Sequence, residues 1–511
     1  MINVRTVAEV RTAEEAAFAL VPEGTLMQRA AFGLSTTVLA LVREARGAAA
    51  GARIALLVGS GNNGGDALWA GAMLARRGCR VDAITVSERW HRQGAEALER
   101  EGGRLHAWPD DAESVLAVVA EADVVVDGIL GIGGAGGLRS PVHSLVEAVA
   151  AGDGFVVAVD APSGVDADTG AVPGAAIDAD VTVTFGAVKP GLVVAPGSVH
   201  CGSTVLIDIG LDFSVAPHVR VLEAIDVAEW VGEPGADSYK YRRGVVGVSA
   251  GSGPYPGAAL LATGAARRAN VGMTRFLDRS DGNASTVVAH FPEIVIDGSA
   301  PKDQARVDAW ACGPGFPGDD TDRHTVDAVL AAAVPVVLDA GALSIVADSA
   351  DVRAAIVDRT AMSLVTVITP HEGEFNRILP GLLDSSPGRL AAAVAAAERL
   401  SAIVVLKGPG TVIAAPDGTS FVDTEGTSDL GTAGSGDVLT GLIGALLAGA
   451  WADGRRSAAD LHAAVAAAVW LHGRAGRLAA KSGPVVSACL ADEIPAAIRV
   501  ARFGDLEERP R

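Results

Sequence analysis

Residues 427–441 constrain the fold more than any other stretch of this chain. They read T-S-D-L-G-T-A-G-S-G-D-V-L-T-G and lie where strand-like sequence gives way to an apolar helical run at 438–447. Small residues let several backbone N–H groups approach one point, and the positive end of a helix dipole follows directly. The stretch therefore predicts an anion-binding turn between a strand and a helix, as found in layered α/β folds.

Asp437 follows this predicted anion site directly. A carboxylate beside a bound phosphate is electrostatically unfavourable. Its presence therefore indicates a base that takes a proton from a hydroxyl group attacking that phosphate. The alternative is an ordinary acidic residue in the first turn of a helix, where the dipole favours it. The sequence upstream favours the first interpretation.

The upstream partner is a lysine–glycine loop, K-G-P-G-T, at 407–411. An apolar strand at 402–406 precedes the loop, and a second strand at 412–415 ends in a Pro-Asp-Gly turn. A strand, a Lys-Gly loop, a hairpin and a glycine-rich anion loop resemble the nucleotide-binding half of ribokinase-like folds. No G-x-x-x-x-G-K-[ST] motif occurs, which excludes an ordinary P-loop.

Strand and helix patterns alternate in two separate series along the 511 residues, a length that predicts at least two domains. Hydrophobic residues make up 49% of the chain and aromatic residues only 4%, which suits small-residue helices packed on parallel sheets. A largely helical stretch at 6–44 precedes the first series. The proline- and glycine-rich stretch 212–243 is predicted to be a linker with one short helix at 224–230. The predicted strands lie at 54–58, 81–85, 124–126, 156–159, 181–185 and 205–207, then at 245–249, 336–338, 365–368 and 403–406.

Charge and cysteine content exclude several classes of function. The net charge of −20 argues against nucleic acid and anionic membranes as partners. The four cysteines are far apart without C-x-x-C spacing, so we expect small core residues in a reducing cytosol and neither a disulfide framework nor a zinc site. The sequence does not open on a basic segment followed by an apolar one, and charged or histidine residues interrupt or border its apolar stretches. We expect a cytoplasmic protein.

Three loops of the first half place polar side chains at predicted strand ends. G-S-G-N-N-G-G-D at 59–66 follows the first strand, Asp127 ends a later one, and V-A-V-D-A-P-S-G brings Asp160 and Ser163 to the next. Ligands bind in the crevice outside the carboxyl ends of parallel strands. An amide, a carboxylate and a hydroxyl that converge there suit a group-I or group-II cation better than zinc. Ordinary turn chemistry is the alternative, since Asn, Asp, Ser and Gly also dominate turns.

The ordered set of motifs resembles one enzyme family over nearly the whole chain. In the first half, G-N-N-G-G-D, D-G-I-L-G-I-G, V-D-A-P-S-G-V-D and F-G-A-V-K-P-G-L resemble the NAD(P)H-hydrate epimerase domain. In the second half, Y-P-G-A-A, C-G-P-G, T-P-H-E-G-E-F, K-G-P-G-T and G-S-G-D resemble the ADP-dependent NAD(P)H-hydrate dehydratase. The resemblance implies an α/β protein of two domains. These are a Rossmann-like three-layer sandwich at 1–220 with epimerase activity and a ribokinase-like three-layer sandwich at 221–511 with dehydratase activity.

In the epimerase half, the resemblance implies that Asp160 is the acid/base and also binds the hydrate. It implies a potassium ion held by Asn63, Asp127 and Ser163. The pattern departs from the family at Ala67, where glycine usually continues the first loop. The remaining implied hydrate-binding residues are Asn62, Asn63, Gly64, Gly65, Asp66, Gly131, Ile132, Gly133, Gly134, Ala135, Gly136 and Gly137.

In the dehydratase half, the resemblance implies that Asp437 is the catalytic base and binds the hydrate together with Gly315 and His371. It implies ADP as co-substrate, and a magnesium ion is expected with it. The chain departs from the family at Gly341, where V-L-D-A-G-A-L lacks an acid, and at Ser435, where threonine is common. The implied nucleotide-binding residues are Lys407, Gly408, Pro409, Gly410, Thr411 and Gly436.

These residues together imply repair of damaged nicotinamide cofactors. The R and S forms of hydrated NADH and NADPH would be interconverted, and ADP would drive dehydration of the S form, giving AMP and phosphate. We expect a homo-oligomer with no nucleic acid or membrane partner. Two alternatives stay open. One is a ribokinase-like small-molecule kinase with a fused ligand-binding domain, and the other is a non-enzymatic binding domain beside a functional C-terminal enzyme.

Overall fold

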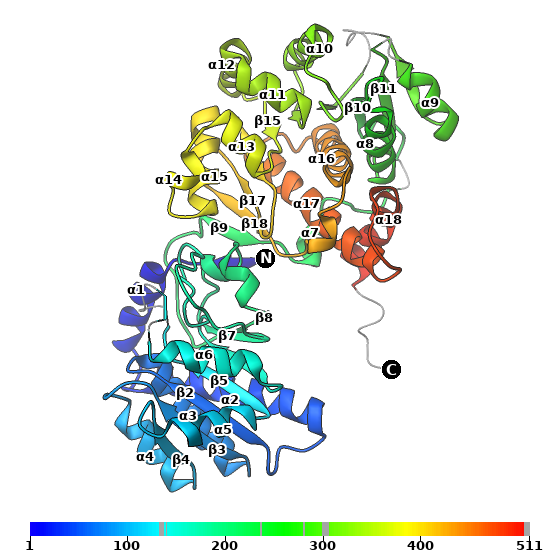
Figure 1. The fold of residues 1–511 in the computed structure, drawn as a ribbon. Helices are drawn as coiled ribbons and strands as arrows, with labels where there is room; N and C mark the ends of the chain where they lie inside the picture. Colours follow the sequence, from blue (N-terminus) through cyan, green and yellow to red (C-terminus); the bar gives the residue numbers. More distant parts are fainter. Residues whose placement is uncertain (132–136, 139, 236–237, 280–281, 299–305, 505–511) are drawn as a thin grey trace. The chain divides into compact units, whose positions relative to one another are not determined.

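The chain divides into two compact units. The computed structural model describes residues 1–131, 137–138, 140–235, 238–279, 282–298 and 306–504. One unit is Asn3–Pro217, and the other comprises His218–Arg511 together with Met1–Ile2. Each unit is built on its own sheet, and helices cover both faces of each sheet (Figure 1).

The N-terminal unit contains a parallel sheet of seven strands in the order β4-β3-β2-β5-β6-β7-β8. The chain runs outward from β2 to β4 and then returns to β5 on the other side of β2. This is a Rossmann-like strand order, and its reversal opens a crevice at the carboxyl ends of β2 and β5. The strands are β2 (Arg53–Val58), β3 (Arg80–Thr85), β4 (Arg104–Ala107), β5 (Val124–Gly128), β6 (Phe155–Val159), β7 (Val181–Phe185) and β8 (Ser203–Ile207).

Alternate side chains of β2 fill two separate cores of this unit. Ile54 and Leu56 pack with helices α2 (Thr25–Arg46), α3 (Asn62–Arg76) and α4 (Arg92–Arg100). Ala55 and Leu57 pack on the other face with α5 (Ala112–Ala120) and α6 (Val142–Ala151). Six of the seven strands were predicted. Five of them, β2, β3, β5, β6 and β7, are buried on both faces and read as continuous apolar runs, whereas β8 is half-buried or exposed and was predicted from its apolar residues 205–207. The edge strand β4 was missed, because its residues R-L-H-A are half-buried or exposed.

The C-terminal unit is built on an eleven-stranded sheet in the order β1-β9-β18-β17-β16-β15-β14-β13-β10-β11-β12, in which only Ile2 of the edge strand β1 belongs to this unit. The seven strands from β10 to β16 are parallel, β17 is antiparallel to both of its neighbours, and β9 is parallel to β18. The strand order reverses between β10 and β13. The strands are β1 (Ile2–Val4), β9 (Val219–Val221), β10 (Val245–Ser249), β11 (Met273–Leu277), β12 (Val295–Asp297), β13 (Ala309–Cys312), β14 (Val336–Leu338), β15 (Thr366–Ile368), β16 (Ile403–Leu406), β17 (Thr411–Ala414) and β18 (Ser420–Asp423).

The predicted linker at 212–243 is only partly a linker. From His218 onward the chain belongs to the C-terminal unit, and β9 pairs with β18 through Val219 opposite Ser420 and Arg220 opposite Phe421. The short helix α7 (Ala224–Ala228) follows. A three-residue strand beside a proline- and glycine-rich stretch gives too weak a pattern to be recognised in the sequence.

Helix α16 (Ser435–Ala452) is the central helix of the C-terminal unit. It packs against α8 (Pro256–Arg268), α17 (Ala458–Ala480), β10 and β13. Helix α10 (Asp320–Leu330) also contacts β13, α12 (Ala350–Ala361) contacts β15, and α15 (Arg389–Leu400) contacts β16 and β17 (Figure 1). Helix α18 (Ser487–Phe503) contacts α17 and α8. A Cβ atom on Gly441 would lie 2.0 Å from the carbonyl oxygen of Ala262, so glycine sets the distance between α16 and α8.

Cysteine positions depart from the sequence expectation at one place. Cys79, Cys201 and Cys312 are buried and free, as small core residues should be, whereas Cys489 is exposed. Cys489 lies near the start of α18. No pattern in the sequence distinguishes its exposed face from a buried one.

Two helices among the described residues, α2 and α16, are long and apolar enough to cross a membrane by length and composition alone. In their most apolar windows, 50% of the α2 residues and 72% of the α16 residues are buried inside the fold. Core helices meet the same criterion, so this is weak evidence for a membrane protein.

We expect Gly441→Ala to destabilise the C-terminal unit by about 1–3 kcal/mol or more, because the new methyl group must push α16 away from the α8 backbone. Gly449→Ala in the same helix is the matched control, since its Cβ atom would have Arg243 O as its nearest neighbour at 3.9 Å. That change should stabilise the unit by about 0.5–1 kcal/mol, because alanine favours the helix. Calorimetric transitions that shift in opposite directions would support this packing. A Gly441→Ala transition at or above the wild-type temperature would contradict it.

Candidate functional site

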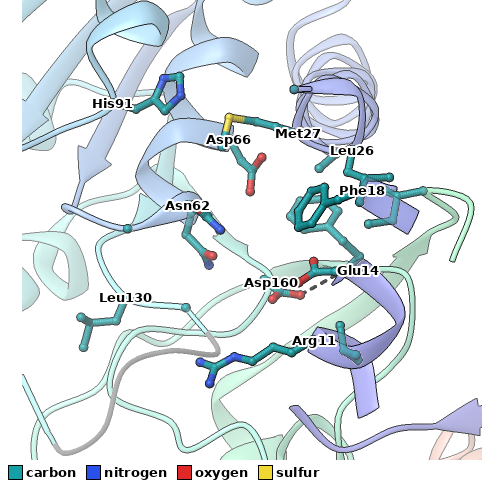
Figure 2. A pocket seen from close by; sticks show the side chains of 18 of the residues that line it. Arg11, Glu14, Phe18, Leu26, Met27, Asn62, Asp66, His91, Leu130 and Asp160 are labelled. Carbon is teal, nitrogen blue, oxygen red and sulfur yellow. Dashed lines mark hydrogen bonds between the residues drawn. The ribbon is translucent and has the colours of Figure 1, made fainter. Parts of the chain in front are cut away.

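A cavity of about 740 Å³ lies at the carboxyl ends of β2, β5 and β6 in the N-terminal unit (Figure 2). Its walls come from the first turn of α3, the loop after β5, Asp160 after β6, and the helices α1 (Val7–Phe18) and α2. This is the crevice at which the strand order reverses. Five residues that the sequence predicted as hydrate-binding line it: Asn62, Asn63, Asp66, Gly131 and Asp160.

Glycines bring the start of α3 close to the loops of the cavity. A Cβ atom on Gly64 would lie 2.3 Å from Gly59 O, and one on Gly59 would lie 1.8 Å from Ile129 O. Backbone atoms cannot yield as the end of a flexible side chain can, so these positions require glycine. Ala67 replaces the family's glycine without a clash because it faces Gly128, where a Cβ atom would lie 2.9 Å from the Ala67 methyl group.

A buried ion pair holds Asp160. Lys189 is fully buried, and its Nζ donates to Asp160 Oδ1, to Thr184 Oγ1 at 3.0 Å and to Phe185 O at 3.0 Å. Thr184 Oγ1 and Phe185 N donate to the same Asp160 oxygen at 3.0 and 3.2 Å. Removing one member of such a pair leaves an uncompensated buried charge. Lys189 lies in the motif F-G-A-V-K-P-G-L, but the sequence analysis gave it no role.

Two further carboxyl groups, Glu14 from α1 and Asp66 from α3, point into the same cavity (Figure 2). Burial raises the pKa of Asp66 well above its ordinary value, and the charges of Asp160 and Glu14 add to that rise. Burial also raises the pKa of Glu14, with the charge of Asp160 adding. The cavity therefore places an ion-paired carboxylate opposite two carboxyl groups that keep their protons to higher pH, which is an acid/base arrangement. Glu14 was missed because it lies on an ordinary amphipathic helix, far from every loop motif.

Asp127 and Ser163, two of the predicted potassium ligands, are in direct contact. Ser163 N and Oγ donate to the two carboxylate oxygens of Asp127 at 2.7 and 2.6 Å, and Ile129 N donates at 3.3 Å. Asp127 is fully buried, and burial raises its pKa to about 6. It has no ion pair with any described residue. A buried carboxylate without a cationic partner fits a bound cation, because an opposite charge would offset the cost of its burial.

The third predicted ligand, Asn63, makes different contacts. Its Nδ2 donates to Val159 O, and its Oδ1 lies 2.1 Å from the position of a Cβ atom on Gly131. The amide oxygen thus lies against the loop after β5. Within the described ranges, no group of three or more His, Cys, Asp or Glu side chains could hold a metal ion.

The rest of the predicted hydrate-binding loop is described only in part. Gly137 packs closely on Gly174, because a Cβ atom on Gly137 would lie 2.8 Å from the Cα atom of Gly174. The predicted residues outside the described part of the chain are Ile132, Gly133, Gly134, Ala135 and Gly136.

A second polar centre forms in the C-terminal unit around Asp339, at the end of β14. Asp339 is 1% exposed, and Lys407 Nζ and Thr369 Oγ1 donate to its Oδ1 at 2.9 and 2.8 Å. Thr440 Oγ1, from α16, donates to its Oδ2 at 2.7 Å. One buried carboxylate thus connects the ends of β14, β15 and β16 with the first turns of α16. The sequence analysis quoted this aspartate in V-L-D-A-G-A-L without giving it a role.

Lys407 begins the predicted nucleotide loop and faces a second carboxylate, Glu374 Oε2, at 3.8 Å. Burial alone would lower the pKa of Lys407, but the charges of Asp339 and Glu374 outweigh burial and raise the pKa above its ordinary value. Arg389 Nη2 donates to Lys407 O at 3.0 Å. Gly408 has φ 149°, and a Cβ atom there would lie 2.5 Å from Arg389 Nη2, so the loop requires glycine at this position.

The remainder of this loop turns tightly into β17. Thr411 Oγ1 donates to Gly408 O at 2.9 Å, and Gly410 has φ 64°. Pro409 lies between the two glycines. The predicted residues of the lysine–glycine loop therefore form one short turn whose lysine reaches Asp339.

Helix α16 begins at Ser435 behind Gly434, which has φ 85° and provides no side-chain cap. The N–H groups of the first turn are therefore available to an anion. A Cβ atom on Gly436 would lie 3.3 Å from Lys407 Nζ, so the lysine ammonium group lies at this helix N-terminus. Asp437 is half-buried, and burial raises its pKa to about 6, with the charge of Asp339 adding and that of Lys407 opposing.

Two histidines of α17 have structural positions. His472 Nε2 lies 3.0 Å from Ser435 O and 3.2 Å from Ser435 Oγ, and burial lowers the pKa of this histidine to about 4. His462 Nε2 lies 2.9 Å from Ile413 O. His472 therefore supports the first turn of α16 from behind.

Gly315 lies in a turn packed on the Y-P-G-A-A segment. It has φ 70°, and a Cβ atom there would lie 2.7 Å from the Ala258 methyl group. Ser252 Oγ donates to Gly315 O at 2.7 Å. Gly341, where the family has an acidic residue, has no room for a side chain. A Cβ atom on Gly341 would lie 2.2 Å from Phe316 O. An acidic side chain at 341 would require the Phe316 backbone to move.

His371 caps helix α13 (Glu372–Ile378), a role that the sequence did not predict. Its Nδ1 accepts from Gly373 N and Glu374 N at 3.0 and 3.3 Å, and Glu374 Oε2 accepts from His371 N at 2.9 Å. The side chain is 60% exposed, and its Nε2 lies 3.6 Å from Glu374 Oε2. Capping fixes the ring and leaves much of it accessible to a ligand.

Family profiles match both units. The family described as NAD(P)H-hydrate dehydratase matches residues 246–498, and the family described as YjeF-related protein N-terminus matches residues 23–191. The two matches do not overlap, and each lies within a single compact unit.

Relatives match along most of the chain. The bifunctional NAD(P)H-hydrate repair enzyme Nnr of Mycobacterium tuberculosis is 43% identical over 463 residues, which cover 90% of this chain and 92% of that protein. The enzyme of the same name from Mycobacterium leprae is 41% identical, covering 95% of this chain and 96% of the relative. A solved structure, an ADP/ATP-dependent NAD(P)H-hydrate dehydratase from Bacillus subtilis co-crystallized with ATP/Mg2+, is 28% identical with a TM-score of 0.46. It covers 56% of this chain and 100% of its own.

We expect His371→Ala to destabilise the C-terminal unit by about 1 kcal/mol, because two N–H groups of α13 lose their acceptor. His371→Asn supplies another good N-cap and should recover most of that stability. Melting temperatures of the two variants test the capping role. Equal losses in both would contradict it.

Proposed function

Because the chain belongs to the family of bifunctional NAD(P)H-hydrate repair enzymes, we propose that its two polar centres are the two active sites of such an enzyme. The protein epimerises hydrated NAD(P)H and dehydrates it back to NAD(P)H. We assign epimerisation to residues 1–220 and the ADP-dependent dehydration of the S form to residues 221–511. One observation carries the proposal, namely that Lys407 and Asp437 meet at the uncapped N-terminus of α16.

Dehydration needs a better leaving group than hydroxide. Transfer of a phosphoryl group from ADP to the hydroxyl of the hydrate supplies one and leaves AMP. Elimination of phosphate, with loss of a proton from the neighbouring ring carbon, then restores the reduced ring. The N–H groups of α16 and the Lys407 ammonium group would stabilise the phosphoryl group in transfer. Asp437 would take the hydroxyl proton, a contribution of about 10²–10⁴ in rate. Gly315 and His371 would help to position the hydrate.

The nucleotide would bind on the loop at 407–411 and on Gly436. A carboxylate set large enough to bind magnesium without the nucleotide does not occur among the described residues. Magnesium would therefore be held mainly by the phosphates of the nucleotide, with one or two protein carboxylates. The metal would neutralise phosphate charge during transfer.

Epimerisation inverts the ring carbon that carries the hydroxyl group and is bonded to the ring nitrogen. A carboxylic acid, Asp66 or Glu14, would protonate the hydroxyl, which leaves as water while the nitrogen lone pair forms a C=N bond. A water molecule would then add to the other face, and the Asp160 carboxylate would take its proton as the C=N electrons return to nitrogen. Lys189 donates to the Asp160 carboxylate and holds it at the cavity for that step.

Asn63, Asp127 and Ser163 would hold a potassium ion, and backbone oxygens of the neighbouring loops would complete its shell. The ion would supply the positive charge that the buried Asp127 carboxylate lacks. It would also keep the loops beside Asp160 in place. A cytoplasmic homo-oligomer remains part of the proposal on sequence grounds alone.

One assay tests the assignment of both sites. A mixture of R and S hydrate epimers is incubated with ADP and magnesium, and recovery of the reduced-cofactor absorbance is followed together with AMP and inorganic phosphate. The proposed enzyme recovers both epimers and releases one phosphate per cofactor. A stable phosphorylated product without recovered absorbance would indicate a small-molecule kinase instead.

We expect Asp437→Asn to lower dehydration by about 10²–10⁴-fold, because the base is lost while the loop N–H groups still bind nucleotide. In the wild type, kcat/KM should rise with pH through about 6 and then level off, since the base must lose its proton. The rate on pure S epimer and the nucleotide Kd measure these effects. Near wild-type turnover in Asp437→Asn would exclude this residue as the base.

We expect Asp127→Ala to abolish most recovery of the R epimer while recovery of the S epimer continues. The wild-type melting temperature of the N-terminal unit should rise in potassium chloride relative to lithium chloride of equal ionic strength, and this difference should vanish in Asp127→Ala. Asp127→Asn, which keeps one oxygen ligand, should lie between them. Equal losses of both activities would instead indicate general instability and contradict the cation site.

A further inference from the structure

A second cavity, of about 500 Å³, opens beside the acidic cavity of the N-terminal unit. Glu23, Gly24, Met27, His91 and Gln93 line both cavities, so the two are continuous. We propose that the second cavity binds the adenosine end of the hydrate, so that this unit recognises the whole dinucleotide. The proposal rests on the epimerase function assigned to the unit. It concerns the adenosine half of the hydrate, which takes no part in the reaction itself.

Aromatic side chains form the wall of this second cavity. Trp69 of α3 and His91 of the loop before α4 have ring centroids 6.3 Å apart with the rings tilted by 59°. Phe32 of α2 lines the same cavity and is 61% exposed, although it is a large apolar side chain. A nucleic acid base stacks on such faces, and each stack strengthens binding appreciably. Figure 2 shows His91 beyond Asp66 and Met27, at the end of the acidic cavity away from Asp160.

The His91 ring of this wall is held in a fixed orientation. His91 Nδ1 accepts from Gly94 N at 3.0 Å as the N-cap of α4, which sets the orientation of the ring. A Cβ atom on Gly65 would lie 2.9 Å from Met27 Cε and 3.3 Å from the His91 ring. The absence of a side chain at Gly65 thus leaves space for Met27 and the His91 ring. The proposed reaction at Asp160 does not require this space. A preformed surface spares a ligand the entropic cost of ordering it.

The topology of the sheet would place the two ends of a bound dinucleotide at the two cavities, with the ring near Asp160 and the adenosine near His91. Dinucleotides bind across the reversal of strand order in a Rossmann-like sheet, with the pyrophosphate at the N-terminus of the helix after the first strand. That helix is α3, which begins at Asn62 behind Gly61 without a side-chain cap. His91 follows β3 on one side of this point, and Asp160 follows β6 on the other. A hydrate whose ring lies at Asp160 would thus extend its adenosine toward His91.

A truncated substrate tests the proposal directly. Epimerisation is measured on the hydrate of NADH and on the hydrate of reduced nicotinamide mononucleotide, which carries the same reacting ring without the adenosine half. The wild type should favour the dinucleotide by about tenfold or more in kcat/KM, the effect of one base stack. Phe32→Ala should raise KM for the dinucleotide about tenfold, with kcat and the mononucleotide kinetics unchanged.

Phe18→Ala is the matched control, because Phe18 is 56% exposed and lines only the acidic cavity. Its effect should be equal on the two substrates. The melting temperature of each variant checks that it folds. Equal wild-type efficiency on the two hydrates, or equal losses on both in Phe32→Ala, would overturn the adenosine site while the epimerase function stands. Failure to epimerise either hydrate would instead overturn the proposed function.

Discussion

The ion pair between Lys407 and the buried Asp339 is the interaction on which the C-terminal centre depends. Asp339 accepts hydrogen bonds from β15, β16 and α16 at once, so this carboxylate fixes where three strand ends and the main helix meet. The pair itself contributes little net stability, because burying two charges costs about as much as their attraction returns. Its value is geometric. With Lys407 held at the N-terminus of α16, an ammonium group and a set of free N–H groups face one point.

The N-terminal unit contains a corresponding ion pair, between the buried residues Lys189 and Asp160. Here the lysine is fully enclosed, and its three hydrogen bonds leave the carboxylate to face the cavity. Each unit thus uses a lysine to hold one carboxylate in place beside other carboxyl groups whose charged form is disfavoured by burial. In the first unit the neighbours are Asp66 and Glu14, and in the second the neighbour is Asp437. Groups with divergent proton affinities in one cavity are suited to general acid and base catalysis.

Close backbone packing makes these centres possible. Gly441 lets α16 approach α8, and Gly59 and Gly64 let α3 begin against the loop after β5. In each case a single methyl group would separate the helix from the backbone it contacts. The glycine-rich motifs therefore serve packing as well as ligand binding, since a helix N-terminus can present its N–H groups only where its first turn lies deep in the fold.

The fold class, most of the central strands and the loops that carry both centres could be predicted from the sequence, because apolar runs and glycine patterns are local and act through the backbone. The same patterns placed Asp437, Asp160, Asp127 and Ser163 at strand or helix ends. What those residues face depends on how distant parts of the chain pack together. Lys189 and Asp160 are 29 residues apart, and Lys407 and Asp339 are 68 apart. No local pattern specifies which buried charge finds which partner. For the same reason the cavity position of Glu14 and the pairing of β9 with β18 appeared only once the chain was folded. The capping by His371 is local, but histidine is not among the preferred N-cap residues, so the sequence did not predict it.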